Sequence, residues 1–154
     1  EIGMDIYTLD IDSGNTTRLT HTFDDWDESG HYSPDGRRIA YLSSTPYPAE
    51  GSNDNWWSWG KGDYWLMSVD GAEKSQLTYF NTPGTLDYMG LRVMSAYIAW
   101  SPDGKRLAIG NVIENPDLST RDEILLIDFG DNAFECGNGA CEIGENSSNC
   151  IEDC

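Results

Sequence analysis

Apolar and polar residues alternate along this chain in short runs rather than in long helical stretches. Residues 97–100, 106–109 and 123–129 are examples, and they are rich in the aromatic and branched side chains typical of β-strands. No segment predicts a helix. The 16 glycines and 6 prolines are spread through the sequence, as many tight turns require. The pattern therefore predicts an all-β protein.

The strand pattern is repeated. Residues 5–20 match residues 63–78 at an offset of 58, and both copies close with Leu-Thr. A second unit, Ser-Pro-Asp-Gly followed by a basic and branched run, occurs at 33–36 and again at 101–104, and a third copy of the first unit opens at Glu123. In Ser-Pro-Asp-Gly the proline fixes φ, the aspartate tolerates the bridge region and the glycine supplies a left-handed residue. We therefore expect a hairpin turn at each Ser-Pro-Asp-Gly.

These repeats resemble those of the TolB-type (WD40-like) β-propeller, and the resemblance covers about residues 5–129. It implies antiparallel four-stranded blades: two strands of one blade, all four of a second at about residues 29–78, and three of a third. A closed propeller has about four to eight blades. We therefore expect residues 1–132 to form an incomplete β-propeller of about two to three blades, which is either a fragment or completes its sheets with other chains.

Residues 133–154 form a separate module that contains all the cysteines: Cys136, Cys141, Cys150 and Cys154. An even number of cysteines in a segment with little apolar content indicates disulfides and an oxidising compartment. Zinc is the alternative, but there is no CxxC pair and no nearby histidine.

The module resembles a small Cys-Gly-Asn-Gly-x-Cys-x-x-Gly-Glu-Asn repeat of secreted bacterial and archaeal proteins. Calcium is its candidate cofactor, with Asn138, Glu145 and Asp153 as oxygen ligands. The alternative is that these residues are only solvated.

Charge narrows the choice of partners. Nine Lys and Arg against 27 Asp and Glu give a net charge of -18, which repels phosphate backbones and anionic lipid. No run approaches the ~18 apolar residues of a membrane helix. We expect a secreted or cell-surface protein, the periplasm included, and no nucleic-acid partner.

The chain is expected to be a processed product or an excerpt, because it begins without Met or signal peptide. Asn15 and Asn146 lie in glycosylation sequons.

The long connections, at residues 44–62, 79–95 and 111–121, are expected on one face of the blades, where binding usually resides. The first of them carries a candidate binding site: Asp54, Asn55, Trp56, Trp57 and Trp59. Aromatic faces beside amides and carboxylates suit a protein partner or a sugar. The alternative is that the tryptophans cover a blade edge.

Two acidic segments predict no site. Asp10 to Gly14 has too few carboxylates for a calcium loop and is expected to be an Asx-stabilised turn. The acidic run at residues 24–28, which includes Asp27, is expected to be a solvated connection.

The sequence shows no catalytic motif. His21 and His31 stand beside no nucleophile, and no nucleophile elbow or phosphate loop is present. We therefore expect no catalytic residues and no enzyme activity.

The function expected from these observations is a non-enzymatic extracellular interaction or assembly protein. Both ends of the repeat array lack strands, and unpaired strand edges recruit other strands. Residues 2–11 and 123–129 are therefore predicted to pair with copies of the same chain, in a ring or a filament. The alternative function is a carbohydrate-binding module that uses the Trp-rich loop.

Overall fold

The computed structural model describes residues 3–47, 60–130 and 141, and in this part the chain is all-β, with nine strands and no helix. The strands form three antiparallel sheets, in the orders β1-β2, β3-β4-β5-β6 and β7-β8-β9. The prediction of nine strands grouped as two, four and three is confirmed. Their bounds are β1 (Tyr7–Leu9), β2 (Thr16–Arg18), β3 (Asp27–Tyr32), β4 (Arg38–Ser43), β5 (Asp63–Ser68), β6 (Lys74–Gln76), β7 (Arg92–Trp100), β8 (Arg106–Glu114) and β9 (Thr120–Asp128).

The two Ser-Pro-Asp-Gly sequences form the hairpin turns that they predict. In the first, Ser33 Oγ donates to Asp35 Oδ1 at 2.5 Å and accepts from the backbone N–H of Arg38 at 3.0 Å. Gly36 has φ 72°, which favours glycine. The turn at Ser101 has the same bonds, at 2.5 and 2.9 Å. Side-chain hydrogen bonds within each turn therefore close the β3–β4 and β7–β8 hairpins.

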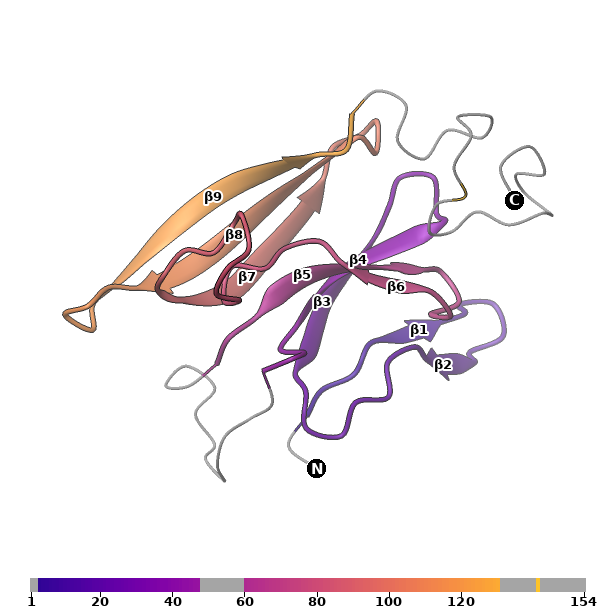
Figure 1. The fold of residues 1–154 in the computed structure, drawn as a ribbon. Coiled ribbons are helices and arrows are strands. Elements are labelled where there is room, and N and C mark those ends of the chain that lie inside the picture. The colour runs from indigo at the N-terminus through magenta and orange to yellow at the C-terminus, as the bar shows by residue number, and fades with distance from the viewer. Residues whose placement is uncertain (1–2, 48–59, 131–140, 142–154) are drawn as a thin grey trace.

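The β3–β6 sheet lies between the other two sheets (Figure 1). One of its faces carries Ile39, Tyr41 and Met67, which pack with Ile6 and Leu19 from the β1–β2 side. Its opposite face packs against the β7–β9 sheet, and the cluster there includes Ala40, Leu42, Tyr64, Leu66, Phe80, Val93, Ile98, Leu107, Ile109 and Ile113. The two cores use alternate residues of β4 and β5, because successive side chains of a strand point to opposite faces.

Two of the expected long loops are shorter than the sequence indicated. The expected loop at residues 111–121 is wrong, because β8 continues to Glu114 and β9 begins at Thr120. Ile113 is fully buried in this extension and pairs with Val93 and Arg121. The loop expected at 79–95 ends earlier, since β7 begins at Arg92. Both extensions carry buried apolar residues, Val93 and Met94 in β7 and Ile113 in β8.

Candidate functional site

Most of the site residues predicted from the sequence lie outside the described residues. These are Asp54, Asn55, Trp56, Trp57 and Trp59 of the Trp-rich loop, the calcium candidates Asn138, Glu145 and Asp153, the cysteines Cys136, Cys150 and Cys154, and Asn146. Cys141 is exposed and disulfide-bonded. Asn15 is exposed between β1 and β2. The expected Asx turn before it is confirmed, since Asp10 Oδ1 accepts from the N–H of Ser13 at 2.7 Å.

A buried carboxylate organises the end of the β5–β6 hairpin. Asp63 Oδ1 accepts from Thr78 Oγ1 at 2.8 Å and from the backbone N–H of Phe80 at 2.9 Å. The same threonine oxygen accepts from the N–H of Tyr64 at 3.0 Å. Burial raises the pKa of Asp63 to about 6, against these hydrogen bonds. Thr78, the threonine of the closing Leu-Thr, therefore holds the chain that leaves β6 to the start of β5 by hydrogen bonds.

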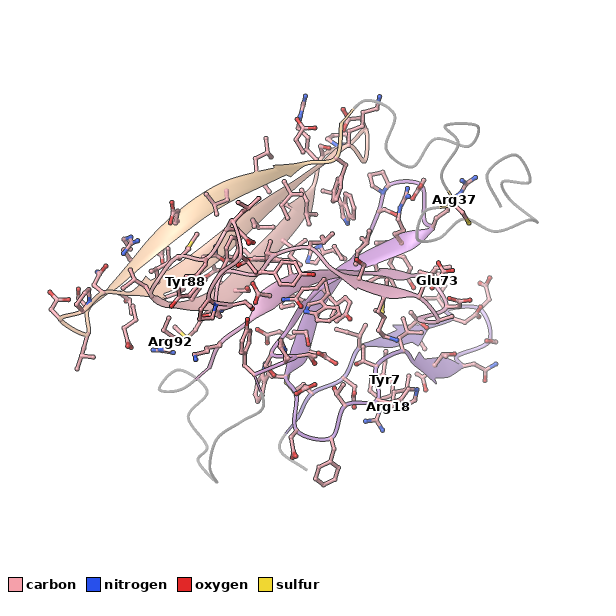
Figure 2. All side chains as sticks on the ribbon, viewed as in Figure 1. Tyr7, Arg18, Arg37, Glu73, Tyr88 and Arg92 are labelled. Atoms are coloured by element: carbon pink, nitrogen blue, oxygen red, sulfur yellow. The ribbon has the colours of Figure 1, made fainter. Side chains whose placement is uncertain are left out.

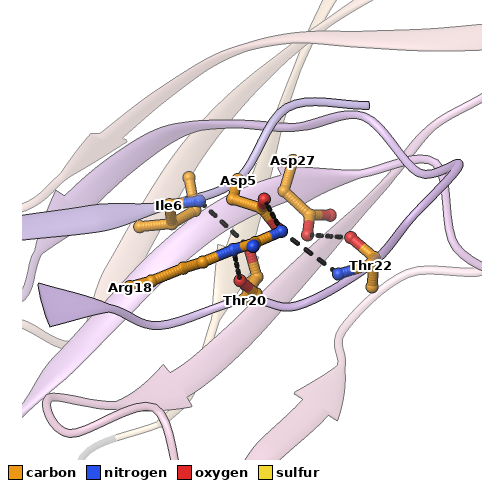
Figure 3. A network of polar contacts seen from close by, with 6 residues as sticks. All are labelled: Asp5, Ile6, Arg18, Thr20, Thr22 and Asp27. Atoms are coloured by element: carbon orange, nitrogen blue, oxygen red, sulfur yellow. Dashed lines mark hydrogen bonds and ion pairs between the residues drawn. The ribbon is translucent and has the colours of Figure 1, made fainter. Parts of the chain in front are cut away.

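The same arrangement recurs in the first repeat (Figure 3). The N–H of Ile6 donates to Thr20 Oγ1 at 2.9 Å, and Thr20 Oγ1 donates to Asp5 Oδ1 at 3.2 Å. Asp5 also forms an ion pair with Arg18 and accepts from the N–H of Thr22 at 3.3 Å. The sequence repeat at an offset of 58 residues is thus also a repeat of hydrogen bonds.

Asp27 lies beside this network, and its burial differs from the solvated connection that was expected for the acidic run. Thr22 Oγ1 donates to Asp27 Oδ2 at 2.9 Å (Figure 3). The expectation of a solvated connection is wrong for this residue, because Asp27 is 2% exposed at the start of β3. Burial raises its pKa. Side-chain hydrogen bonds from Ser43, Thr22 and Thr20 act against this rise.

Asp27 lines a cavity of about 250 Å³ between the chain that leaves β2 and the β3–β6 sheet. Tyr41 and Trp65 form part of its wall, with ring centroids 6.5 Å apart. The Nε1 atom of Trp65 is buried and has no hydrogen-bond partner. Besides Asp27 and the two aromatic residues, His21 and Lys74 line the cavity.

The second candidate site is the outward face of the β7–β9 sheet. Tyr97 pairs with Gly110, which pairs with Ile124, so these three residues form one row across the sheet. A neighbouring row ends at Leu126. Tyr97, Ile124 and Leu126 are 72%, 81% and 60% exposed. We call Tyr97, Ile124 and Leu126 the β9 face.

A second exposed apolar surface lies at the other end of the stack. Tyr7 and Leu9, on β1, are 57% and 59% exposed, and Tyr7 is labelled on the β1–β2 sheet in Figure 2. They point away from Ile6, which is buried against the β3–β6 sheet. We call Tyr7 and Leu9 the β1 face.

Residues of both faces correspond, in the sequence repeat, to residues that are buried between sheets inside the stack. Ile124 and Leu126 correspond by repeat to Tyr64 and Leu66, which are 0% and 2% exposed where the β3–β6 sheet meets the next sheet. Tyr7 and Leu9 correspond likewise to Trp65 and Met67, which meet the β1–β2 side. The sequence did not reveal these faces, because alternation alone does not say which side of an end strand is covered.

Within residues 3–47, 60–130 and 141, no group of three or more His, Cys, Asp or Glu side chains is placed to hold a metal ion. The same residues include no helix that is long and apolar enough to cross a membrane.

Comparison with known proteins gives one informative similarity. No family model matches the chain. A protein of Agrobacterium fabrum, "Uncharacterized protein Atu1656", is 31% identical over 135 residues, which cover 82% of this chain and 36% of that protein. The chain therefore spans about a third of the length of this relative.

Proposed function

We propose that this chain is a non-enzymatic interaction and assembly module, built from TolB-type propeller blades, whose copies associate head to tail. The observation that carries the proposal is the pair of exposed apolar faces at opposite ends of the sheet stack. Each is the repeat equivalent of a face that is buried within the stack. The β9 face of one copy is thus matched to the β1 face of the next.

The contacts between the sheets provide the template for this interface. Tyr64 projects from the β3–β6 sheet and its hydroxyl donates to the carbonyl of Gly110 on β8 at 2.5 Å. Its ring packs edge-on against Phe80, with centroids 6.4 Å apart. Ile124, at the equivalent position, has no such cover among the described residues. Burial of one large apolar side chain contributes about 1.5–3 kcal/mol, so docking of the β9 face favours association.

The edge of β9 also supports association between copies of the chain. Within the described residues β9 pairs with β8 alone, whereas its repeat equivalent β5 pairs on both sides. An exposed edge of nine residues is a ready template for strand pairing. A head-to-tail contact of this kind is heterologous, so it gives a ring if the rotation closes and a filament if it does not. The proposal also holds that the chain is secreted and glycosylated, and that its four-cysteine module is disulfide-bonded and binds calcium.

Sedimentation velocity over a range of concentrations tests the proposal. We expect the wild-type protein to associate as its concentration rises. Ile124→Asp should abolish this association, because it places a charge in the centre of the β9 face. Leu86→Asp is the matched control, since Leu86 is fully exposed outside both faces, and it should sediment as the wild type does.

A mixing experiment adds the direction of the contact. Ile124→Asp blocks the β9 face, and Tyr7→Asp blocks the β1 face. Each variant alone should be monomeric, whereas an equal mixture should form a dimer through the one intact pair of faces. A wild-type monomer at high concentration, or two variants that fail to combine, contradicts head-to-tail assembly.

A further inference from the structure

The cavity between the chain after β2 and the β3–β6 sheet corresponds, in the sequence repeat, to a place that is packed between the β3–β6 and β7–β9 sheets. Its lining includes the buried residues Asp27 and Tyr41, the partly buried Trp65, and the exposed residues His21 and Lys74. We propose that this cavity binds a small aromatic carboxylic acid, with its ring against Tyr41 and Trp65 and its carboxylate toward Lys74. The inference goes beyond assembly and uses none of the residues of the two outer faces.

Thr22, which lines the cavity, occupies the place that Phe80 has in the next repeat. The N–H of Thr22 donates to Asp5 at 3.3 Å, and the N–H of Phe80 donates to the equivalent Asp63 at 2.9 Å. Phe80 is 4% exposed, and its ring packs edge-on against Tyr64 in the core between the sheets. The first repeat therefore lacks an aromatic ring that the second repeat packs at the equivalent place.

The wall on the β3–β6 side of the cavity is aromatic. Tyr41 and Trp65 occupy the places that Ile109 and Leu125 have in the packed core, and their ring centroids are 6.5 Å apart. Aromatic rings attract one another in offset or edge-on arrangements, with centroids about 4.5–7 Å apart. The cavity thus combines an aromatic wall with a small residue, Thr22, where the packed core has a ring.

The size of the cavity suits one ring with a short substituent. Its volume is about 250 Å³. An apolar cavity of about 150 Å³ is large enough to bind benzene, whereas pockets for drug-sized ligands enclose about 300–1,000 Å³. A single ring with a short acidic group lies between these two sizes.

The charged residues around the cavity favour an acid. His21 and Lys74 lie at its exposed end, which we call the mouth, and Asp27 lies at its buried side. Asp27 accepts from Thr22 at 2.9 Å and from other side chains, so its carboxylate has partners within the protein. Lys74 donates to the carbonyl of Gly71, and an ammonium group has two further N–H groups to donate. A ligand carboxylate at the mouth is therefore attracted by Lys74, whereas an amine there is repelled by it.

Titration with benzoate and with phenylacetate, followed by NMR on the whole chain, tests the proposal. A bound aromatic ring changes the resonance frequencies of protons beside it, so the methyl groups of Thr22 and Thr45 and the ring of Trp65 report on the cavity. We expect their signals to shift saturably with at least one of the two acids. Acetate has the charge without the ring, and benzylamine has the ring with the opposite charge, so neither should cause a saturable shift.

Thr22→Phe tests the site by filling it. The variant places in the first repeat the ring that Phe80 supplies in the second, and it should weaken binding of the acid about tenfold or more. Thr22→Ser is the matched control, because it keeps a small side chain and the hydroxyl that donates to Asp27, and binding should stay within about twofold of the wild type. Thermal unfolding confirms that both variants are folded.

Lys74→Gln tests the carboxylate contact, and it does so even if Thr22→Phe does not fold. Loss of the positive charge should weaken binding about two- to fivefold. Lys105→Gln is the control, since Lys105 lies in the β7–β8 turn and does not line the cavity, and it should leave binding unchanged.

Each part of the proposal has an outcome that overturns it. No saturable shift of the cavity signals with either acid overturns the site, and so does equal binding by wild type and folded Thr22→Phe. Binding of acetate or benzylamine as tight as that of the aromatic acids overturns the ligand class. Unchanged affinity in Lys74→Gln overturns the contact with Lys74.

Discussion

Asp63 makes the stability of this protein depend on pH in an unusual direction. Its pKa is about 6 in the folded protein, against an ordinary value of 3.8. A carboxyl whose pKa is raised by folding binds more protons in the folded state between these two values. Its contribution is therefore most favourable at low pH and is lost as the pH rises from about 4 to about 6. The difference of about two pH units corresponds to about 3 kcal/mol.

Asp63→Asn removes this titration and keeps an oxygen that can accept from Thr78 and from the N–H of Phe80. Urea unfolding at pH 4, 5, 6 and 7, followed by tryptophan fluorescence, gives the free energy of unfolding of both proteins. We expect the variant to gain up to about 3 kcal/mol relative to the wild type between pH 4 and pH 7. Any fixed cost of the substitution leaves this slope unchanged.

Asp103→Asn is the control for Asp63→Asn. Hydrogen bonds from Ser101 and from the N–H of Lys105 lower the pKa of Asp103. A lowered pKa gives stability that is present above the ordinary value and is lost as the pH falls. Because this loss occurs below the ordinary value of 3.8, the free-energy difference between this variant and the wild type should be nearly flat from pH 4 to pH 7. A free-energy difference between Asp63→Asn and wild type that is flat from pH 4 to pH 7 would refute the reasoning.

Two further predictions compare equivalent or conservative substitutions by urea unfolding at pH 7. Leu66→Ala should cost about 2–5 kcal/mol, whereas Leu126→Ala, at the equivalent but exposed position, should change stability by less than about 0.5 kcal/mol; equal costs would contradict the equivalence. Thr78→Val leaves the N–H of Tyr64 and the carboxylate of Asp63 without the threonine oxygen and should cost about 1–3 kcal/mol. Thr78→Ser keeps that oxygen, so a loss as large as in Thr78→Val would show that the hydrogen bonds do not matter.

The strand arrangement was largely predictable because the repeats carry their own turn chemistry. Each Ser-Pro-Asp-Gly forms its hairpin with local side-chain bonds, such as that from Ser33 to Asp35. Strand ends were less predictable. The segment at 111–114 contains asparagine and glutamate and reads as a loop, but it continues β8 because it pairs with both β7 and β9.

The candidate sites depend on contacts that the sequence does not display. Asp27 stands in an acidic run that reads as solvated, yet it is buried at the start of β3, where Thr22 donates a hydrogen bond to it. Trp65 reads as an ordinary strand residue. Only the packing of the chain after β2 on the β3–β6 sheet brings both residues to one cavity.

The central claim is that the β9 face is covered when copies of the chain associate. Methyl NMR with a soluble paramagnetic probe measures this residue by residue. As protein concentration rises, the probe should lose access to the methyl groups of Ile124 and Leu126, while those of Leu86 stay accessible. Equal access to Ile124, Leu126 and Leu86 at every concentration would contradict the claim.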